Sequence, residues 1–306
     1  MGFKVLVSDP LADAAVAAMR EAGLTVEVNT DLTPEALKET IAVYDAIVVR
    51  SATKVRQEII DAGTDLKLIV RAGVGLDNID VEYARGKGIA VRNTPAASSN
   101  SVAELALGHL LSTARHIGRG TASLKEGKWE KKQLKGVEID GKTLGIIGIG
   151  RIGQYLARKA AALGMHVIAY DKFVAKNPLP DMVTMVPFEE LLKESDFVSL
   201  HIPYDSKLGA VIGAKEIEMM KDGVCIINCA RGGVIDEAAL AAALASGKVA
   251  AAALDVFAVE PPDTGQALFT QENLSLTPHI GAATLEAQGR VGKEAAQTVI
   301  EFAKSL

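Results

Sequence analysis

The sequence predicts an α/β protein built from two doubly wound parallel sheets. Short runs rich in Val, Ile and Leu alternate with longer stretches of helical periodicity, which is the pattern of repeated strand–helix units. Most of these runs are apolar at every position, as expected for strands that helices cover on both faces. The runs outnumber the strands of a usual doubly wound sheet, so we expect two domains.

The candidate strands fall into two groups along the chain. The first group comprises Lys4–Ser8, Thr25–Val28, Ala46–Arg50, Leu68–Arg71 and Ile89–Arg92. The second group comprises Thr143–Ile147, His166–Tyr170, Phe197–His201, Val224–Asn228, Ala250–Val256 and Leu274–Thr277. Because helical stretches separate the strands, we expect right-handed crossovers and parallel pairing within each group.

Capping signals mark the predicted helix ends. Asp9-Pro10 and Thr33-Pro34 each place a capping side chain before Pro at a first helical position. Ser101-Val-Ala-Glu104 is a capping box, and it predicts a long helix that runs to about His116. The glycines that predict helix ends are Gly164 and Gly247.

Two small, polar segments predict the crossings between the domains. Asn93–Asn100 (NTPAASSN) contains Pro, and a second such segment lies near Gly281–Thr284. The last helical stretch, about Leu285–Ser305, then returns to the first domain. The predicted domains are residues 1–97 with 285–306, and residues 98–284; an arm at about 101–140 holds a basic stretch and the single Trp.

Composition excludes several classes of protein. The 306 residues are 49% apolar and 23% charged, with a net charge of −5, so non-specific nucleic-acid binding has no electrostatic support. The two cysteines, Cys225 and Cys229, are too few for a disulfide framework, and no His/Cys/Asp cluster has the spacing of a metal site. We expect no signal peptide, no membrane span, no bound metal and a cytoplasmic location.

A glycine motif stands between a candidate strand and a helix in Leu144–Gly153 (LGIIGIGRIG). Gly148, Gly150 and Gly153 allow a tight turn, close approach of a pyrophosphate, and close helix–strand packing. The helix N-terminus would then offer free N–H groups to the pyrophosphate. Asp171 ends the next strand, where a carboxylate accepts hydrogen bonds from ribose hydroxyls and repels a 2′-phosphate. The motif therefore predicts NAD.

Two alternatives to this interpretation stay open. A glycine-rich turn can bind no nucleotide, although the flanking strand, helix and acidic residue argue against that. Lys172 follows Asp171 and weakens the repulsion of a 2′-phosphate, which keeps NADP as the second alternative.

Three charged residues follow successive candidate strands of the second group: Arg231 in NCARGG, Glu260 in DVFAVEPP and His279 in TPHIGA. Ligands of open parallel sheets bind beyond the carboxyl ends of the strands, so all three are expected beside the cofactor loop. A histidine can take the proton of a secondary alcohol as hydride leaves carbon, and a carboxylate orients the imidazole. An arginine fork can hold a substrate carboxylate and polarise the C2 oxygen.

Each of these residues has a simpler interpretation when taken alone. The arginine could form a surface ion pair, the glutamate could be solvated, and the histidine could be satisfied within a loop. Their occurrence together beside a dinucleotide motif favours a catalytic set. The remaining histidines are expected to be structural, and His201 is expected to wall the nicotinamide pocket.

The first domain carries a predicted anion clamp. Arg50, Ser51 and Lys54 follow one strand, and Arg71 with Gly73-Val74-Gly75 follows another. The Gly-rich turn offers backbone N–H groups that suit a carboxylate or phosphate. Extra cations indicate a substrate with a second anionic group, although ordinary surface charge is the alternative.

These motifs together resemble the D-isomer-specific 2-hydroxyacid dehydrogenase family, over essentially the whole chain. The resemblance implies a Rossmann NAD-binding domain inserted in a smaller flavodoxin-like substrate domain, and a homodimer through the long helix and its arm. It implies that Arg231, Glu260 and His279 are catalytic and that Asp255 binds the nicotinamide amide. Implied cofactor contacts are Val74, Gly148, Gly150, Arg151, Ile152, Gly153, Asp171, His201, Ile202, Pro203, Cys229, Ala230, Asp255, His279, Gly281 and Ala282. Implied substrate contacts are Arg50, Ser51, Arg71, Gly73, Val74, Gly75, Arg231 and His279.

Within the family, VVRSATKV, RAGVGLDNID, ASLKEGKWEKK and NCARGGVIDE resemble the members that act on D-3-phosphoglycerate in the first step of serine biosynthesis. Two departures are NTPAASSN, which lacks a usual Asn-Gly, and Ser206, where Thr is usual. The chain ends at Leu306, so the C-terminal regulatory domain of longer members is expected to be absent.

Two other functions compete with this interpretation. One is a reductase for glyoxylate, hydroxypyruvate or another 2-keto acid, which the extra cations disfavour. The other is a non-catalytic NAD(H)-binding sensor or corepressor on the same fold, which the catalytic residues do not exclude.

Overall fold

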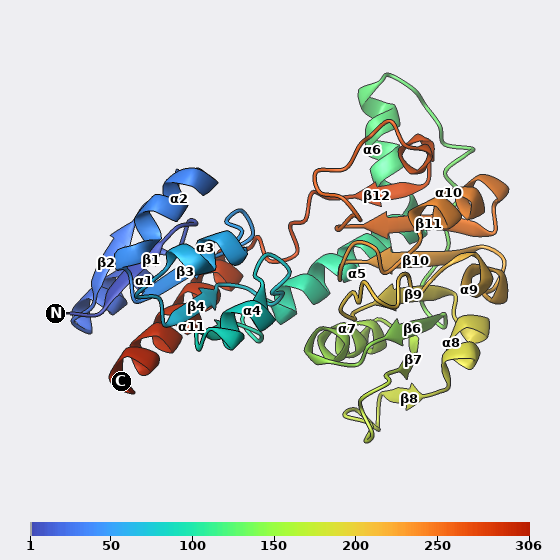
Figure 1. The fold of residues 1–306 in the computed structure, drawn as a ribbon. Helices are drawn as coiled ribbons and strands as arrows, with labels where there is room; N and C mark the ends of the chain where they lie inside the picture. The colour runs from blue at the N-terminus through green and yellow to red at the C-terminus, as the bar shows by residue number, and fades with distance from the viewer. Residues whose placement is uncertain (1) are drawn as a thin grey trace. The chain divides into compact units, whose positions relative to one another are not determined.

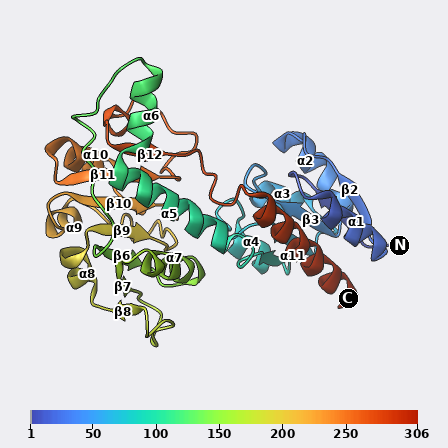
Figure 2. The ribbon, with the colours of Figure 1, turned by 180° about the vertical axis from the view of Figure 1, so that it is seen from behind.

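The computed structural model describes residues 2–306. The chain divides into two compact units, each with its own parallel sheet (Figures 1 and 2). The first unit contains the residues up to Ser98 together with Ala282–Leu306, and the second unit contains Ser99–Gly281. The predicted fold class is confirmed: both sheets are parallel, and helices cover both faces of each.

The sheet of the first unit has the strand order β2-β1-β3-β4-β5, which is the flavodoxin-like order. Its strands are β1 (Lys4–Val7), β2 (Thr25–Val28), β3 (Ala46–Val49), β4 (Leu68–Arg71) and β5 (Ala90–Asn93). Its helices are α1 (Asp13–Glu21), α2 (Pro34–Thr40), η1 (Ile41–Val43), α3 (Gln57–Ala62), α4 (Val81–Gly86) and α11 (Leu285–Lys304).

Strand β1 shows how the two faces of this sheet are covered. Val5 and Val7 pack with residues of α1 and α11 on one face. Leu6 points the other way and packs with residues of α2 and α3. Successive strand side chains alternate between faces, so an all-apolar strand needs both helical layers. The C-terminal helix therefore completes the first unit (Figure 1).

The sheet of the second unit has the order β12-β11-β10-β9-β6-β7-β8, with every printed pair parallel. Its strands are β6 (Thr143–Ile147), β7 (His166–Tyr170), β8 (Val183–Met185), β9 (Phe197–Leu200), β10 (Val224–Asn228), β11 (Val249–Leu254) and β12 (Leu274–Leu276). Its helices are α5 (Ser99–Arg115), α6 (Ile117–Lys125), α7 (Arg151–Ala162), α8 (Phe188–Glu194), α9 (Ala214–Met219), α10 (Glu237–Ser246) and η2 (Ala267–Thr270).

The order reverses at β6, as in a dinucleotide-binding sheet: β7 and β8 lie on one side of it and β9 to β12 on the other. Helices α5 and α7 bury Ala106, Leu110 and Leu156 against one face. Helices α8, α9 and α10 bury residues such as Leu191 and Leu240 against the other (Figure 2). Ligands of such sheets bind at the carboxyl ends of the strands beside the reversal, which here are β6 and β9.

Two predicted helix starts were wrong, and one strand was missed. Asp9 does not cap a helix: α1 begins at Asp13, and the Asp9 carboxylate instead binds the loop after β3. Ser101 does not open α5, which begins at Ser99. The strand β8 was missed, because it is short and lies at the sheet edge beside β7. Thr33 does cap α2, since its side chain accepts from the Ala36 N–H.

Several strands end one residue sooner than predicted, which moves functional residues into loops. Arg50, His201 and Thr277 each follow the last residue of a strand. They lie at carboxyl ends, where parallel sheets bind ligands.

Candidate active site and cofactor loop

The turn between β6 and α7 is built so that only glycine fits at two of its positions. Gly148 has φ +96°, and a Cβ there would lie 2.6 Å from the His201 carbonyl oxygen. A Cβ on Gly153 would lie 2.3 Å from the Gly148 carbonyl oxygen, so the helix packs tightly onto its own turn. Gly150 precedes the 12-residue helix α7 without a capping side chain. The first N–H groups of α7 therefore suit the pyrophosphate of a dinucleotide.

Asp171 lies beside this turn, as the motif predicts. Its carboxylate accepts hydrogen bonds from the Ile149 N–H at 3.0 Å, the Phe173 N–H at 2.8 Å and the Val174 N–H at 3.2 Å. It thus joins the glycine turn to the loop after β7. The carboxylate is only partly buried and can still accept from a ribose hydroxyl.

His201 follows β9 and lies next to Gly148. Its Nε2 is 2.9 Å from the Ser199 hydroxyl oxygen. Burial lowers the pKa of His201 to about 4, so the ring is neutral at physiological pH. The Ile202 side chain lies 2.7 Å from where a Cβ of Gly148 would be. His201 and Ile202 thus lie against the glycine turn, and their contact with the nicotinamide stays a prediction.

Arg231 follows β10 in a loop held by Asn228. The Asn228 amide donates to the Arg231 carbonyl oxygen at 2.9 Å and accepts from the Ala230 N–H at 3.0 Å. A Cβ on Gly232 would lie 1.8 Å from the Phe257 carbonyl oxygen, so only glycine allows this approach. The structure therefore places the loop of Arg231 against the loop that leads to Glu260.

The structure brings Glu260 and His279 together. The Glu260 Oε2 atom lies 2.7 Å from the His279 Nδ1 atom, and Glu260 Oε1 accepts from the Phe257 N–H at 3.1 Å. The two side chains remain 37% and 46% exposed, so a substrate can reach the imidazole. His279 has φ +53°, a left-handed conformation that a residue with a Cβ rarely adopts.

Asp255 holds the backbone that follows His279. Its carboxylate accepts from the Ile280 N–H at 2.8 Å, the Gly281 N–H at 2.9 Å and the Thr277 hydroxyl at 2.6 Å. Asp255 is only 1% exposed. The sequence predicted a contact with the nicotinamide amide, but it did not predict this anchoring role. The sequence signal that could have indicated the anchoring role is an acidic residue directly after β11 together with a Thr directly after β12.

In the first unit, the loop that carries Arg50 and Ser51 is anchored by the side chains of Asp9 and Asn78. The Asp9 carboxylate, 4% exposed, accepts from the Arg50 N–H at 2.5 Å and the Thr53 N–H at 3.2 Å. The Asn78 amide donates to the carbonyl oxygens of Arg50 and Thr53, at 2.7 and 2.6 Å. A sequence pattern does not reveal these anchors, because they come from separate strand ends.

The Gly-rich turn after β4 packs closely around the side chain of Arg71. Gly73 has φ +156°. A Cβ on Gly73 would lie 1.5 Å from the Arg71 Nη1 atom, so the guanidinium occupies the space that a side chain would need. The Asn93 amide donates to the Val74 carbonyl oxygen at 2.5 Å. The predicted clamp lies in the first unit and the three catalytic candidates lie in the second, and each set is built within its own unit.

Both cysteines of the described chain are free and buried. Burial raises the pKa of Cys225 to about 11 and also raises the pKa of Cys229, so both thiols are protonated and poorly nucleophilic. Among residues 2–306, no group of His, Cys, Asp and Glu could hold a metal ion. No helix within these residues is long and apolar enough to span a membrane.

Known proteins resemble this chain over its whole length. Residues 107–281 match the family described as "D-isomer specific 2-hydroxyacid dehydrogenase, NAD binding domain". A hydroxypyruvate reductase of Thermotoga maritima is 52% identical over 301 residues, covering 98% of each chain. A D-3-phosphoglycerate dehydrogenase of Archaeoglobus fulgidus is 47% identical over 305 residues, which are 99% of this chain and 58% of that one. A D-lactate dehydrogenase from Aquifex aeolicus, solved with NAD and lactic acid, superimposes with a TM-score of 0.85 at 31% identity, covering 99% and 96% of the two chains.

Proposed function

This chain belongs to the D-isomer-specific 2-hydroxyacid dehydrogenase family, and we propose that it oxidises D-3-phosphoglycerate at C2 to 3-phosphohydroxypyruvate. Its cofactor is NAD, which supplies the hydride acceptor when bound. The observation that carries the chemistry is the Glu260–His279 pair at the edge of the dinucleotide-binding sheet. The role that follows is the first step of serine biosynthesis in the cytoplasm.

His279 is the proposed acid–base residue. The Glu260 carboxylate accepts from the Nδ1–H of the imidazole, so Nε2 carries the lone pair. That nitrogen takes the C2 hydroxyl proton as the hydride leaves C2, and the C2–O bond becomes a carbonyl. In the reverse direction the protonated imidazole returns the proton to the oxygen, and the carboxylate stabilises its positive charge.

Arg231 is the proposed anchor of the substrate carboxylate. It follows β10, the strand adjacent to β11, and its loop contacts the loop of Glu260. A guanidinium fork matches a carboxylate with two parallel hydrogen bonds and can polarise the C2 oxygen. Substrate orientation at C2 would then depend on this side chain.

The clamp of the first unit is proposed to hold the second anionic group. Arg50 and Arg71 supply positive charge, and the turn Gly73-Val74-Gly75 with Ser51 supplies small polar contacts. Hydrogen bonds with buried Asp9 and half-buried Asn78 hold the loop of Arg50. The resemblance to D-3-phosphoglycerate dehydrogenases supports phosphate as that group.

The remaining site residues are proposed as contacts of NAD. In the second unit they are the turn residues Gly148, Gly150, Arg151, Ile152 and Gly153, followed by Asp171, His201, Ile202, Pro203, Cys229, Ala230, Asp255 and Gly281. In the first unit they are Val74 and Ala282.

A homodimer is part of the proposal. Trp129 is 79% exposed, and Leu124 and Ile117 on α6 are 60% and 55% exposed. Large apolar side chains gathered on one arm favour contact with another chain, and a second copy is the partner that family membership supports.

Reduction of hydroxypyruvate is the second candidate function. The relative that matches this chain over 98% of both lengths is a hydroxypyruvate reductase. Hydroxypyruvate has the same 2-keto acid group but no phosphate, so Arg231, Glu260 and His279 would serve it equally. The two functions therefore differ only in the clamp.

NADH consumption with four 2-keto acids tests the proposed function. We expect 3-phosphohydroxypyruvate to exceed hydroxypyruvate, glyoxylate and pyruvate in kcat/KM by at least about tenfold, or about 1.4 kcal/mol of transition-state preference. A higher value for hydroxypyruvate or glyoxylate would assign the chain to the reductases. The absence of turnover with every acid would favour a non-catalytic NAD(H) sensor.

Replacement of Arg50 by alanine is expected to act selectively on phosphorylated substrates. The kcat/KM for 3-phosphohydroxypyruvate should fall at least about tenfold, the loss of one charge-assisted contact, with little change for pyruvate. Arg85→Ala is the matched control, because it removes the same charge from an exposed position of α4 in the same unit, outside the clamp. Equal losses in the two variants, or on both substrates, would reject a specific phosphate contact.

A further inference from the structure

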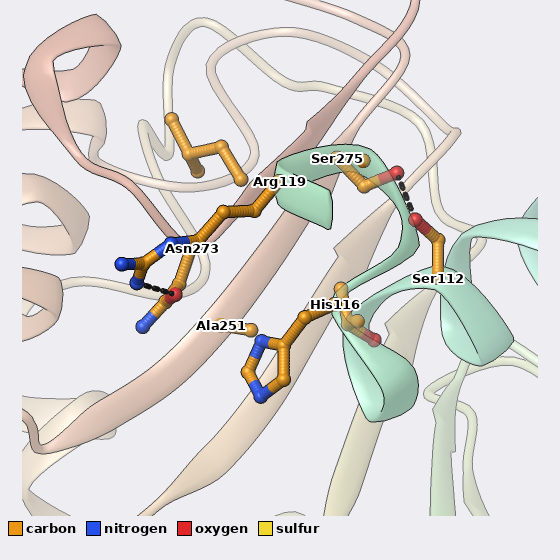
Figure 3. Close-up of a pocket in the computed structure, with 9 residues that line it drawn as sticks. Ser112, His116, Arg119, Ala251, Asn273 and Ser275 are labelled. Atoms are coloured by element: carbon orange, nitrogen blue, oxygen red, sulfur yellow. Dashed lines mark hydrogen bonds between the residues drawn. The ribbon is translucent and has the colours of Figure 1, made fainter. Parts of the chain in front are cut away.

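A chain of hydrogen-bonded side chains runs from α5 to the loop of His279. His109 of α5 is 3% exposed, with Nδ1 2.9 Å from the Ser275 hydroxyl oxygen and Nε2 2.9 Å from the Thr277 hydroxyl oxygen. The Thr277 hydroxyl donates to Asp255, and the hydroxyl oxygens of Ser275 and Ser112 are 3.0 Å apart. Figure 3 shows the Ser112–Ser275 end, beside a small cavity. All five residues belong to the second unit.

At neutral pH, only one assignment of hydrogen-bond donors and acceptors fits these five side chains. An ionised carboxylate only accepts, so the single hydroxyl proton of Thr277 points to Asp255. The Thr277 oxygen must then accept from the His109 Nε2–H. Burial lowers the pKa of His109, with Asp255 opposing in part, so the ring is neutral and its Nδ1 accepts from Ser275. Ser112 can then donate to Ser275, because hydroxyl protons rotate.

The far end of this chain controls the backbone around His279. Asp255 accepts from the N–H groups of Ile280 and Gly281, the two residues after His279. The His279 N–H donates to the Thr277 carbonyl oxygen at 3.1 Å. His279 is therefore held on both sides by groups that His109 contacts through Thr277. Its left-handed φ is unfavourable for a residue with a Cβ, so the surroundings must impose it.

We propose that His109 is a positioning residue for the acid–base step. Its Nε2–H directs the Thr277 hydroxyl onto Asp255, and Asp255 then fixes the loop that aims His279 at Glu260 and the substrate. The proposal rests on the proposed function of His279. Without the Nε2–H, Thr277 can turn its proton away, and Asp255 loses one of the three donors that fix its carboxylate.

Two substitutions of His109 separate positioning from simple packing. The amide nitrogen of Gln reaches the place of Nε2, whereas the amide of Asn reaches only the place of Nδ1. His109→Gln thus keeps the donor to Thr277, and His109→Asn keeps only the contact with Ser275. Each removes one buried hydrogen bond, so both should lower Tm. We expect His109→Asn to reduce kcat roughly ten- to a hundredfold with unchanged KM for NAD, and His109→Gln to retain most of kcat.

Two substitutions of Thr277 test the same role. They keep the proposal testable if the His109 variants do not fold. Thr277→Val keeps the shape and removes the hydroxyl, and should reduce kcat as His109→Asn does. Thr277→Ser keeps the hydroxyl and should restore kcat. The spectroscopic readout is the ¹⁵N spectrum of histidine-labelled protein, where we expect His109 as the Nε2–H tautomer and a changed His279 signal in Thr277→Val.

The outcomes distinguish this inference from the proposed function. Turnover in His279→Ala near the wild-type rate would remove the proposed acid–base role of His279, and this inference with it. An inactive His279→Ala together with normal kcat in His109→Asn and Thr277→Val would reject the positioning role alone. His109→Asn and His109→Gln could instead lose kcat equally, each in proportion to its fall in Tm. That result would show that His109 acts only through packing.

Discussion

Replacement of His279 by alanine is expected to lower kcat/KM by about 10³-fold while NADH still binds. Acid–base catalysis by a positioned histidine contributes 10²–10⁴-fold as a rule, and no other described imidazole contacts Glu260. The measurement is NADH oxidation with the preferred 2-keto acid, together with quenching or enhancement of NADH fluorescence for binding. The loss belongs to the chemical step, because the glycine turn and Asp171 remain intact.

The control for this variant is His166→Ala. His166 begins β7, at the end of the strand opposite Asp171, and its side chain is exposed. We expect wild-type kcat/KM in that variant. Turnover in His279→Ala within a few-fold of the wild-type value would show that another group carries the proton.

Replacement of Arg231 is expected to have the second large effect, and on substrate rather than on cofactor. Arg231→Ala should reduce kcat/KM on the order of 10²–10³-fold, because truncating one partner of a desolvated charge pair costs about 3–4 kcal/mol. Arg231→Lys keeps the charge but loses the planar fork, so an intermediate loss is expected. Steady-state kinetics and NADH binding measure the two effects separately.

Arg158→Ala provides the matched charge control for Arg231. Arg158 lies on an exposed position of α7, so its removal changes net charge equally without altering the loop after β10. Unchanged kinetics are expected. If Arg231→Ala weakened NADH binding as strongly as it weakened substrate use, the carboxylate-anchor role would be wrong.

Local patterns were sufficient to predict the residues at the strand ends. The run LGIIGIGRIG predicted its turn and helix correctly. Three glycines in that spacing are needed where the backbone approaches as closely as it does at Gly148 and Gly153. Arg231, Glu260 and His279 were predicted from their places after successive strands, and the structure brings two of them into contact. Parallel strands share one carboxyl edge, so sequence position implied spatial nearness.

Capping residues were a less reliable guide. Asp9 before Pro10 has the composition of a helix start, yet its carboxylate binds the loop of Arg50 instead. A carboxylate that can cap a helix can equally accept backbone N–H groups from another strand end. The tertiary contact decided between the two, because burial at 4% exposure requires partners that the local chain did not supply.

The sequence by itself determined the class of fold, the cofactor turn and the residue types of the catalytic set, because each depends on short-range spacing along one strand, turn or helix. Only the tertiary structure decided what holds His279 in place. His109 and Thr277 are 168 residues apart in the chain and meet because α5 packs across the strands β11 and β12. A hydrogen bond between such distant groups leaves no periodic signal, since its geometry is set by the packing of whole elements rather than by neighbouring residues.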